Sequence, residues 1–176
     1  MGNEKVIILM PAQLRALQEL REALPAGDVF VLKCASGAGR TAVLRELQAA
    51  EGGILIGIRE FVRSMSGRDL FAMEEALLDE IDRALRAHDL VIVDDLHLVS
   101  QVVNRWQAAR SHLLDALLTA ILDEAAACRK KLVFGVEEQA PWPVQRRAHE
   151  FEMDDFAEED VAVLYGDAVK VGFGVD

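Results

Sequence analysis

The segment Cys34–Thr41, CASGAGRT, has the residue types needed to bind the phosphates of a nucleotide. Its small residues allow consecutive backbone N–H groups to turn toward a phosphate, and a helix that follows would add the positive end of its dipole. The segment matches the phosphate-loop pattern G-x-x-x-x-G-K-[ST] with two departures, because Cys34 replaces the first glycine and Arg40 replaces the lysine. The predicted nucleotide-binding residues are Cys34, Ala35, Ser36, Gly37, Ala38, Gly39, Arg40 and Thr41.

A pair of acids, Asp94 and Asp95, follows the apolar run Leu90–Val93. In nucleotidases with this arrangement the first acid holds the Mg²⁺ shell and the second polarises the attacking water. We therefore predict Thr41 and Asp94 as metal ligands and Asp95 as a catalytic residue. Alone, the loop could be a glycine-rich turn and the acids a turn or a helix cap. Their correct order, about fifty residues apart, favours a single site.

Strands and helices alternate along the chain around these two motifs. Continuous apolar runs predict buried strands, and apolar residues at helical spacing predict helices. The expected strands are 29–32, 54–58, 90–93, 132–136 and a short 151–153, and the expected helices are 11–24, 41–51, 69–87, 104–128 and 157–168. This alternation predicts a doubly wound α/β fold with a parallel sheet. We expect strand 29–33 beside strand 90–94, with the phosphate loop and Asp94 converging at their carboxyl ends.

Residues 25–165 resemble the core of the AAA+ ATPases, a family of P-loop NTPases. The stretch from Gly53 to Val99 is similar to the family's segment from the second strand to the Walker B motif, and KKLVFGVEEQAPWPVQRRAHEFEMDDFAEEDVAVL to its sensor-1 strand, arginine-finger region and first lid helix. The resemblance implies ATP or ADP and Mg²⁺ as cofactors. It also implies catalytic roles for Arg146 and Arg147 in the arginine-finger region, although solvated surface charges remain an equal alternative.

The resemblance divides the chain into a nucleotide-binding core, residues 1–155, and the start of a lid or a C-terminal tail, residues 156–176. It also shows departures. Glu137 and Glu138 stand where the family has Asn or Thr at the end of the sensor-1 strand, and the sensor-2 arginine has no counterpart. The expected function is an ATP-binding domain of a protein-remodelling assembly with weak or impaired hydrolysis. The alternatives are a non-hydrolysing structural or regulatory domain and an initiator or helicase-loader module.

Composition limits the function classes. The 176 residues are 52% hydrophobic and 28% charged, which is typical of one globular domain, and no apolar run reaches the roughly 20 residues of a membrane span. The net charge is −11 and the sequence has no basic stripe, which counts against a nucleic-acid partner bound through its phosphates. We expect a cytoplasmic protein with a protein partner or substrate, which forms oligomers only with a complete lid or the full-length protein. The two cysteines are too few for a zinc site and are expected to stay reduced.

Overall fold

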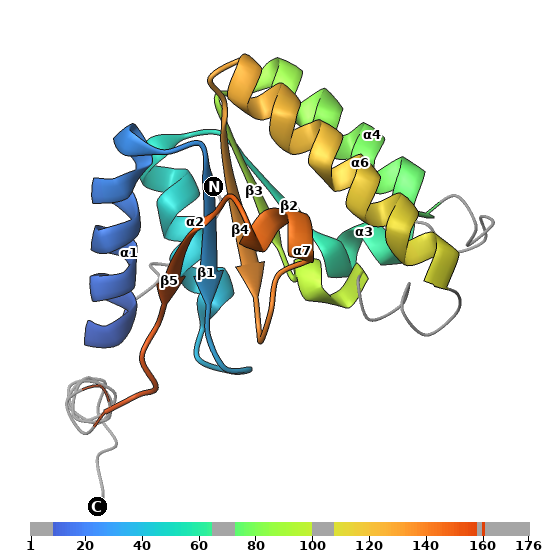
Figure 1. Cartoon of the computed structure of the whole chain (residues 1–176). Coiled ribbons are helices and arrows are strands. Elements are labelled where there is room, and N and C mark those ends of the chain that lie inside the picture. Colours follow the sequence, from blue (N-terminus) through green and yellow to red (C-terminus); the bar gives the residue numbers. More distant parts are fainter. Residues whose placement is uncertain (1–8, 65–72, 100–107, 158–159, 161–176) are drawn as a thin grey trace, which may run out of the picture.

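A five-stranded parallel sheet lies at the centre of the molecule, between two layers of helices (Figure 1). The computed structural model describes residues 9–64, 73–99, 108–157 and 160. The strands are β1 (Val29–Lys33), β2 (Ile54–Gly57), β3 (Leu90–Asp94), β4 (Lys131–Val136) and β5 (His149–Glu152). All registered pairs are parallel, which confirms the predicted α/β fold class.

The helices cover the two faces of the sheet. On one face lie α1 (Pro11–Ala23), a 3-10 turn η1 (Leu24–Ala26) and α2 (Arg40–Glu51); on the other lie α3 (Ile58–Ser64), α4 (Met73–Ala87), α6 (Ala108–Ala127) and α7 (Trp142–Gln145). Alternate strand residues point to opposite faces, so Phe30 packs with α1 and α2 whereas Val31 packs with α4 and α6. Two apolar cores, one on each face, therefore hold the sheet.

The strand order is β2-β3-β4-β1-β5. The prediction that strand 29–33 lies beside strand 90–94 is wrong, because β4 is inserted between β1 and β3 and pairs with both. The two strands are nevertheless parallel and end at the same edge. The convergence of the phosphate loop with Asp94 is therefore confirmed: the Thr41 hydroxyl donates to Asp94 Oδ2 over 2.5 Å.

Several element boundaries differ from the expectation. Ile58 starts α3 instead of ending β2, and the short helix α7 was not expected. Within α1, Leu14 is 51% exposed although it is apolar, while the polar Gln13 is buried. Residues 69–72 and 104–107 and most of 157–168, which were predicted as helical, lie outside the described residues, as does most of the expected lid or tail. No helix in the described ranges is long and apolar enough to cross a membrane.

Candidate nucleotide-binding site

The phosphate loop connects β1 to α2 at the carboxyl edge of the sheet. Gly37 and Gly39 have φ angles of 87° and 85°, a conformation that side chains disfavour, so these two positions require glycine. Cys34 occupies the first glycine position of the pattern. Its φ is not positive, and its side chain is buried. The backbone thus accepts a cysteine at that departure from the pattern.

Gln13 supports the loop from α1. Its Nε2 donates to the carbonyl oxygen of Ala38 over 2.9 Å, and its Oε1 accepts the backbone N–H of Met10 over 2.9 Å. A Cβ atom at Gly39 would collide with this amide. The contact was missed from the sequence, where Gln13 was one polar residue in an amphipathic helix.

Arg40 begins α2, and its side chain extends across the end of the sheet to both Asp94 and Asp95. Its Nε donates to Asp94 Oδ1 over 2.7 Å, and its Nη2 donates to Asp95 Oδ1. The three side chains are buried, with 7%, 5% and 9% of their surfaces exposed for Arg40, Asp94 and Asp95. Arg40, which replaces the phosphate-loop lysine, therefore forms buried ion pairs with both acids.

A second arginine completes this network. Arg59 of α3 donates from Nε to Asp95 Oδ2 over 2.8 Å, with 59% of its side chain exposed. Asp95 has a φ of 64°, a left-handed conformation that is costly for a residue with a side chain, and its N–H donates to Asp94 Oδ1 over 2.9 Å. Together with the Thr41 hydroxyl on Asp94 Oδ2, these bonds engage all four carboxylate oxygens of the two acids.

The buried pairing keeps Arg40 charged. Burial alone would lower the pKa of the guanidinium, but the hydrogen bond and the negative charge of Asp94 outweigh it, so the pKa is raised above its ordinary value. Burial raises the pKa of the Cys34 thiol, against the opposing effect of the Arg40 charge. Cys34 is thus a neutral packing residue beneath the loop.

The Mg²⁺ ion implied by the resemblance does not fit the side chains as they are arranged. Mg²⁺ requires oxygen ligands at about 2.0–2.1 Å in octahedral geometry. Thr41 and Asp94 are adjacent, as the prediction required, but Asp94 accepts a hydrogen bond from Thr41 with one oxygen and from Arg40 with the other. A cation at Asp94 would therefore lie beside the buried Arg40 guanidinium, whose positive charge opposes it.

A cavity of about 500 Å³ opens above the network. Its lining brings together the loop, the start of α2, the end of β2, the start of α3 and the ends of β3 and β4, and Arg45 adds a further positive charge. The lining residues are Ala35, Ser36, Gly37, Gly39, Arg40, Thr41, Arg45, Leu55, Gly57, Arg59, Glu60, Asp94, Asp95 and Glu137. Six of the eight predicted nucleotide-binding residues therefore face one cavity; Cys34 and Ala38 are buried behind it.

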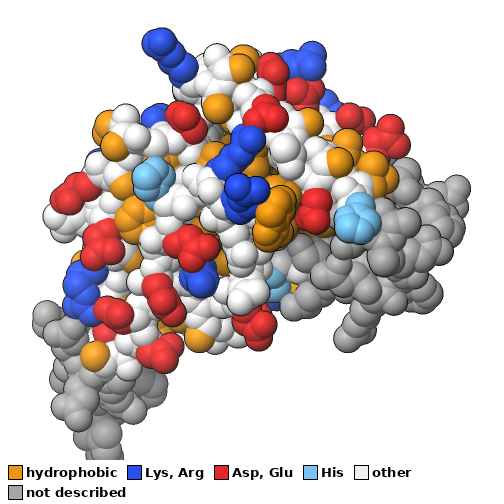
Figure 2. Space-filling model, viewed as in Figure 1, with side chains coloured by type: hydrophobic (Ala, Val, Ile, Leu, Met, Phe, Trp, Pro, Cys, Tyr) orange, Lys and Arg blue, Asp and Glu red, His pale blue; other side chains and the backbone are white. Residues whose placement is uncertain are grey.

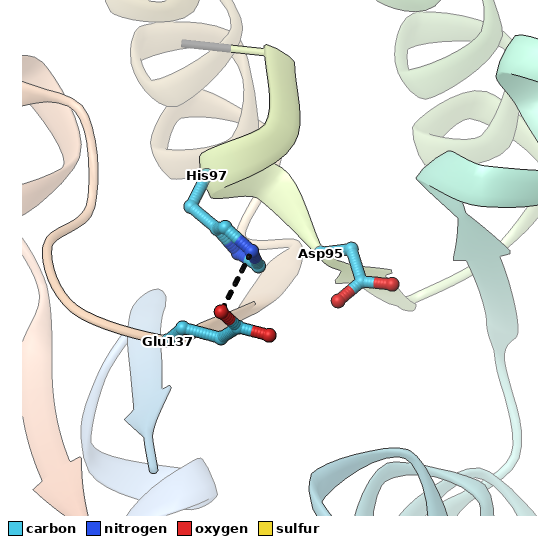
Figure 3. A group of neighbouring side chains, drawn as sticks. All are labelled: Asp95, His97 and Glu137. Atoms are coloured by element: carbon cyan, nitrogen blue, oxygen red, sulfur yellow. Dashed lines mark ion pairs between the residues drawn. The ribbon is translucent and has the colours of Figure 1, made fainter. Parts of the chain in front are cut away.

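Glu137 enters this cavity from the loop after β4 and lies opposite a histidine that the sequence did not mark as functional. His97 Nε2 is 3.6 Å from Glu137 Oε2, and Asp95 lies within 4.8 Å of the group (Figure 3). His97 is buried, and its Nδ1 atom has no hydrogen-bond partner among the described residues. Burial lowers the pKa of His97, while the charge of Glu137 opposes that shift. His97 and Glu137 therefore lie side by side at the cavity wall.

The two predicted arginine-finger residues lie away from this cavity. The Arg146 guanidinium stacks over the ring of Trp142 at 4.9 Å, and Arg147 Nη1 is 2.5 Å from Asp123 Oδ1 of α6. Neither lines the cavity beside the phosphate loop. Within one chain, therefore, Arg146 and Arg147 do not act on a phosphate at that loop.

A phosphate loop followed by a helix, with acids at the end of a neighbouring parallel strand, defines a P-loop nucleotide-binding fold. No family model and no curated protein matches the sequence. Among solved structures, AMPPCP-bound DnaA from Aquifex aeolicus has a TM-score of 0.63 at 14% identity, over 99% of this chain and 57% of that one. The Walker-type ATPase of Pyrococcus abyssi has a TM-score of 0.57 at 17% identity, over 92% of this chain and 59% of that one. The ORC2 protein of Aeropyrum pernix has a TM-score of 0.53 at 16% identity, over 97% and 55%.

The chain has the fold of the AAA+ P-loop ATPases. It spans between half and two thirds of the length of these structures, since it covers 57%, 59% and 55% of them.

Proposed function

We propose that this chain is an AAA+ type nucleotide-binding domain whose ATP hydrolysis is weak or absent, and that it serves within a larger assembly acting on a protein partner. Support for nucleotide binding comes from the loop geometry. The positive φ angles of Gly37 and Gly39 turn the backbone, the start of α2 faces the cavity, and the cavity has the size of a small-molecule site.

One observation carries the proposal of impaired hydrolysis: both oxygens of Asp95 accept hydrogen bonds from guanidinium groups. A general base must reach the attacking water and accept its proton. Arg40 and Arg59 each donate to one oxygen of Asp95, so both oxygens already have partners when a water would approach. The domain is expected to retain a bound nucleotide without turning it over.

Arg146 and Arg147 remain candidates for a finger that acts on a neighbouring subunit. Such an arginine stabilises the charge of the transition state only when it is supplied to another subunit's phosphate. Both residues are exposed in the turn that follows α7, and Trp142 beside them is 60% exposed. This surface would contact a partner in the assembly, and a single chain would be mostly monomeric.

The test is a titration of ADP and ATP by calorimetry, together with phosphate release measured over a range of protein concentrations and sizing by light scattering. Nucleotide binding with slow release from a monomer is the expected result. Brisk turnover that does not depend on concentration would contradict impaired hydrolysis, and no detectable heat with either nucleotide would contradict the binding function itself.

A second candidate function, an initiator or helicase-loader module, is favoured by the similarity to DnaA. The charge distribution opposes it. On the face drawn in Figure 2, the described basic side chains are interspersed with acidic ones and form no continuous tract, and the whole chain has a net charge of −11. Fluorescence anisotropy with labelled single-stranded DNA separates the two candidates, and we expect no binding at physiological salt.

A further inference from the structure

We propose that the Arg40 guanidinium takes the place of the divalent cation, so that this site excludes Mg²⁺ and binds its nucleotide as the metal-free anion. The inference rests on the proposed nucleotide-binding function and specifies the form of the ligand. The acids Asp94 and Asp95 stand where a metal-binding pair is expected, but their partners in the structure are the arginines Arg40 and Arg59.

The first step concerns ligand atoms. A metal at Asp94 needs a free oxygen lone pair directed into the cavity. Asp94 Oδ1 accepts bonds from Arg40 Nε and the Asp95 N–H, at 2.7 and 2.9 Å, and Oδ2 accepts the Thr41 hydroxyl at 2.5 Å. The guanidinium lies where it shields the side of Asp94 that faces Asp95. The Thr41 hydroxyl spends only its proton on this bond, so the exclusion of a cation rests on the Arg40 guanidinium beside Asp94.

The second step concerns charge. In the usual site a lysine and two acids leave one negative charge, which Mg²⁺ reverses when the nucleotide binds. Here Arg40 and Arg59 together cancel Asp94 and Asp95. A divalent ion would have to enter beside a buried guanidinium, where charge repulsion is little screened. The network thus neutralises the two acids without a divalent ion.

The third step concerns the phosphates. They would meet the N–H groups of the loop, the start of α2 and Arg45 on one side of the cavity, and Glu137 on the other. Because Glu137 repels the terminal phosphate, a diphosphate is favoured over a triphosphate. The ligand that this site fits best is a nucleoside diphosphate without metal.

Two measurements test the inference separately from the proposed function. The first titrates Mn²⁺, as a probe for Mg²⁺, into the nucleotide-free protein and follows free Mn²⁺ by electron paramagnetic resonance. The wild type should bind no more Mn²⁺ than Asp94→Asn, whereas Arg40→Ala should gain one site that is lost again in Arg40→Ala with Asp94→Asn. The control is Arg86→Ala, which removes an arginine from Asp82 on the surface of α4 and should create no site.

The second measurement titrates ADP in Mg²⁺ and in EDTA. Dissociation constants that agree within about twofold are expected for the wild type, and Arg40→Lys should bind ADP about tenfold more tightly with Mg²⁺ than without, a difference of about 1.4 kcal/mol. An Asp94-dependent Mn²⁺ site in the wild type, or wild-type ADP binding that is about tenfold tighter with Mg²⁺, would overturn the inference. If ADP binds in neither buffer, the proposed nucleotide-binding function is wrong, and so is the inference that the site binds a metal-free nucleotide. The Mn²⁺ titration would still decide whether Arg40 excludes the cation.

Discussion

The substitution Arg40→Met tests whether the guanidinium holds the two Walker B acids in place. Methionine retains most of the apolar volume but removes the charge, which leaves Asp94 buried with no cationic partner and Asp95 with Arg59 alone. Removing one partner of a buried ion pair typically costs about 3–5 kcal/mol. For a chain of this size, each kcal/mol lowers the melting temperature by roughly 2–4 °C.

The loss of unfolding free energy in Arg40→Met has an upper limit that depends on pH. A buried carboxylate without a partner takes up a proton when protonation costs less than the buried charge. For an ordinary aspartate protonation costs about 4 kcal/mol at pH 7 and about 1.5 kcal/mol at pH 5. In the variant the native state binds this extra proton, so stability is lost as the pH rises. The destabilisation relative to wild type should therefore be largest at pH 7 and shrink toward pH 5.

Urea denaturation of both proteins at pH 7, 6 and 5 measures this difference in unfolding free energy. The matched control is Arg21→Met, since Arg21 forms a 2.6 Å ion pair with Glu51 at the surface, where such pairs contribute about 0–1 kcal/mol. Adding Asp94→Asn to Arg40→Met should recover part of the lost stability, because it removes the charge that has lost its cationic partner, whereas Asp95 keeps Arg59. A loss below about 1 kcal/mol that does not change with pH would refute the idea that Arg40 compensates buried carboxylates.

Three further perturbations follow from the site. Arg59→Ala should cost less than about 1 kcal/mol in thermal unfolding, because Arg59 is half exposed and Asp95 keeps its buried partner; a loss as large as that of Arg40→Met would contradict this ranking. Glu137→Gln should raise the affinity for ATP relative to ADP by about fivefold, or roughly 1 kcal/mol, in calorimetric titrations, and an unchanged ratio would place Glu137 away from the terminal phosphate. Gly39→Ala should destabilise the chain by about 1–2 kcal/mol because of its left-handed φ, and further because the new Cβ collides with the Gln13 amide. Adding Gln13→Ala should relieve the collision, so strictly additive losses in urea denaturation of the double variant would exclude it.

The layers of the fold could be predicted from the sequence, whereas the strand order could not. Apolar runs such as Val29–Leu32 and Leu90–Val93 identify strands that are buried on both faces, and their alternation with helices requires a parallel sheet. All these runs are similarly apolar, and nothing in their residues shows that β4 pairs between β1 and β3. Convergence of the loop and Asp94 was predictable nonetheless, because carboxyl ends of parallel strands share an edge.

The residue types of the site were visible in the sequence, but the partners of those residues were not. Arg40 stood out as a replacement for lysine, yet its contact with both acids depends on where a long side chain turns after the loop closes. Arg59 lies in α3, a helix that was not predicted, and 36 residues before its partner Asp95. His97 carries no mark of function in the sequence, and the position of β4 brings Glu137 next to it. Each of these contacts joins segments that are distant in sequence, so local patterns carry no signal for them.

The exchange of lysine for arginine changes which group neutralises the acids. An ammonium is a point charge on a flexible stem and leaves room for a metal beside it, whereas a guanidinium is a planar fork with several donors. At position 40 the fork spans the gap between Asp94 and Asp95, and two donors on one planar group fix both carboxylates at once. We propose that the same contacts that stabilise the charged arginine also remove Asp95 from base catalysis and Asp94 from metal binding. If one side chain causes both losses, a variant at position 40 that restores metal binding should also restore the conditions for hydrolysis.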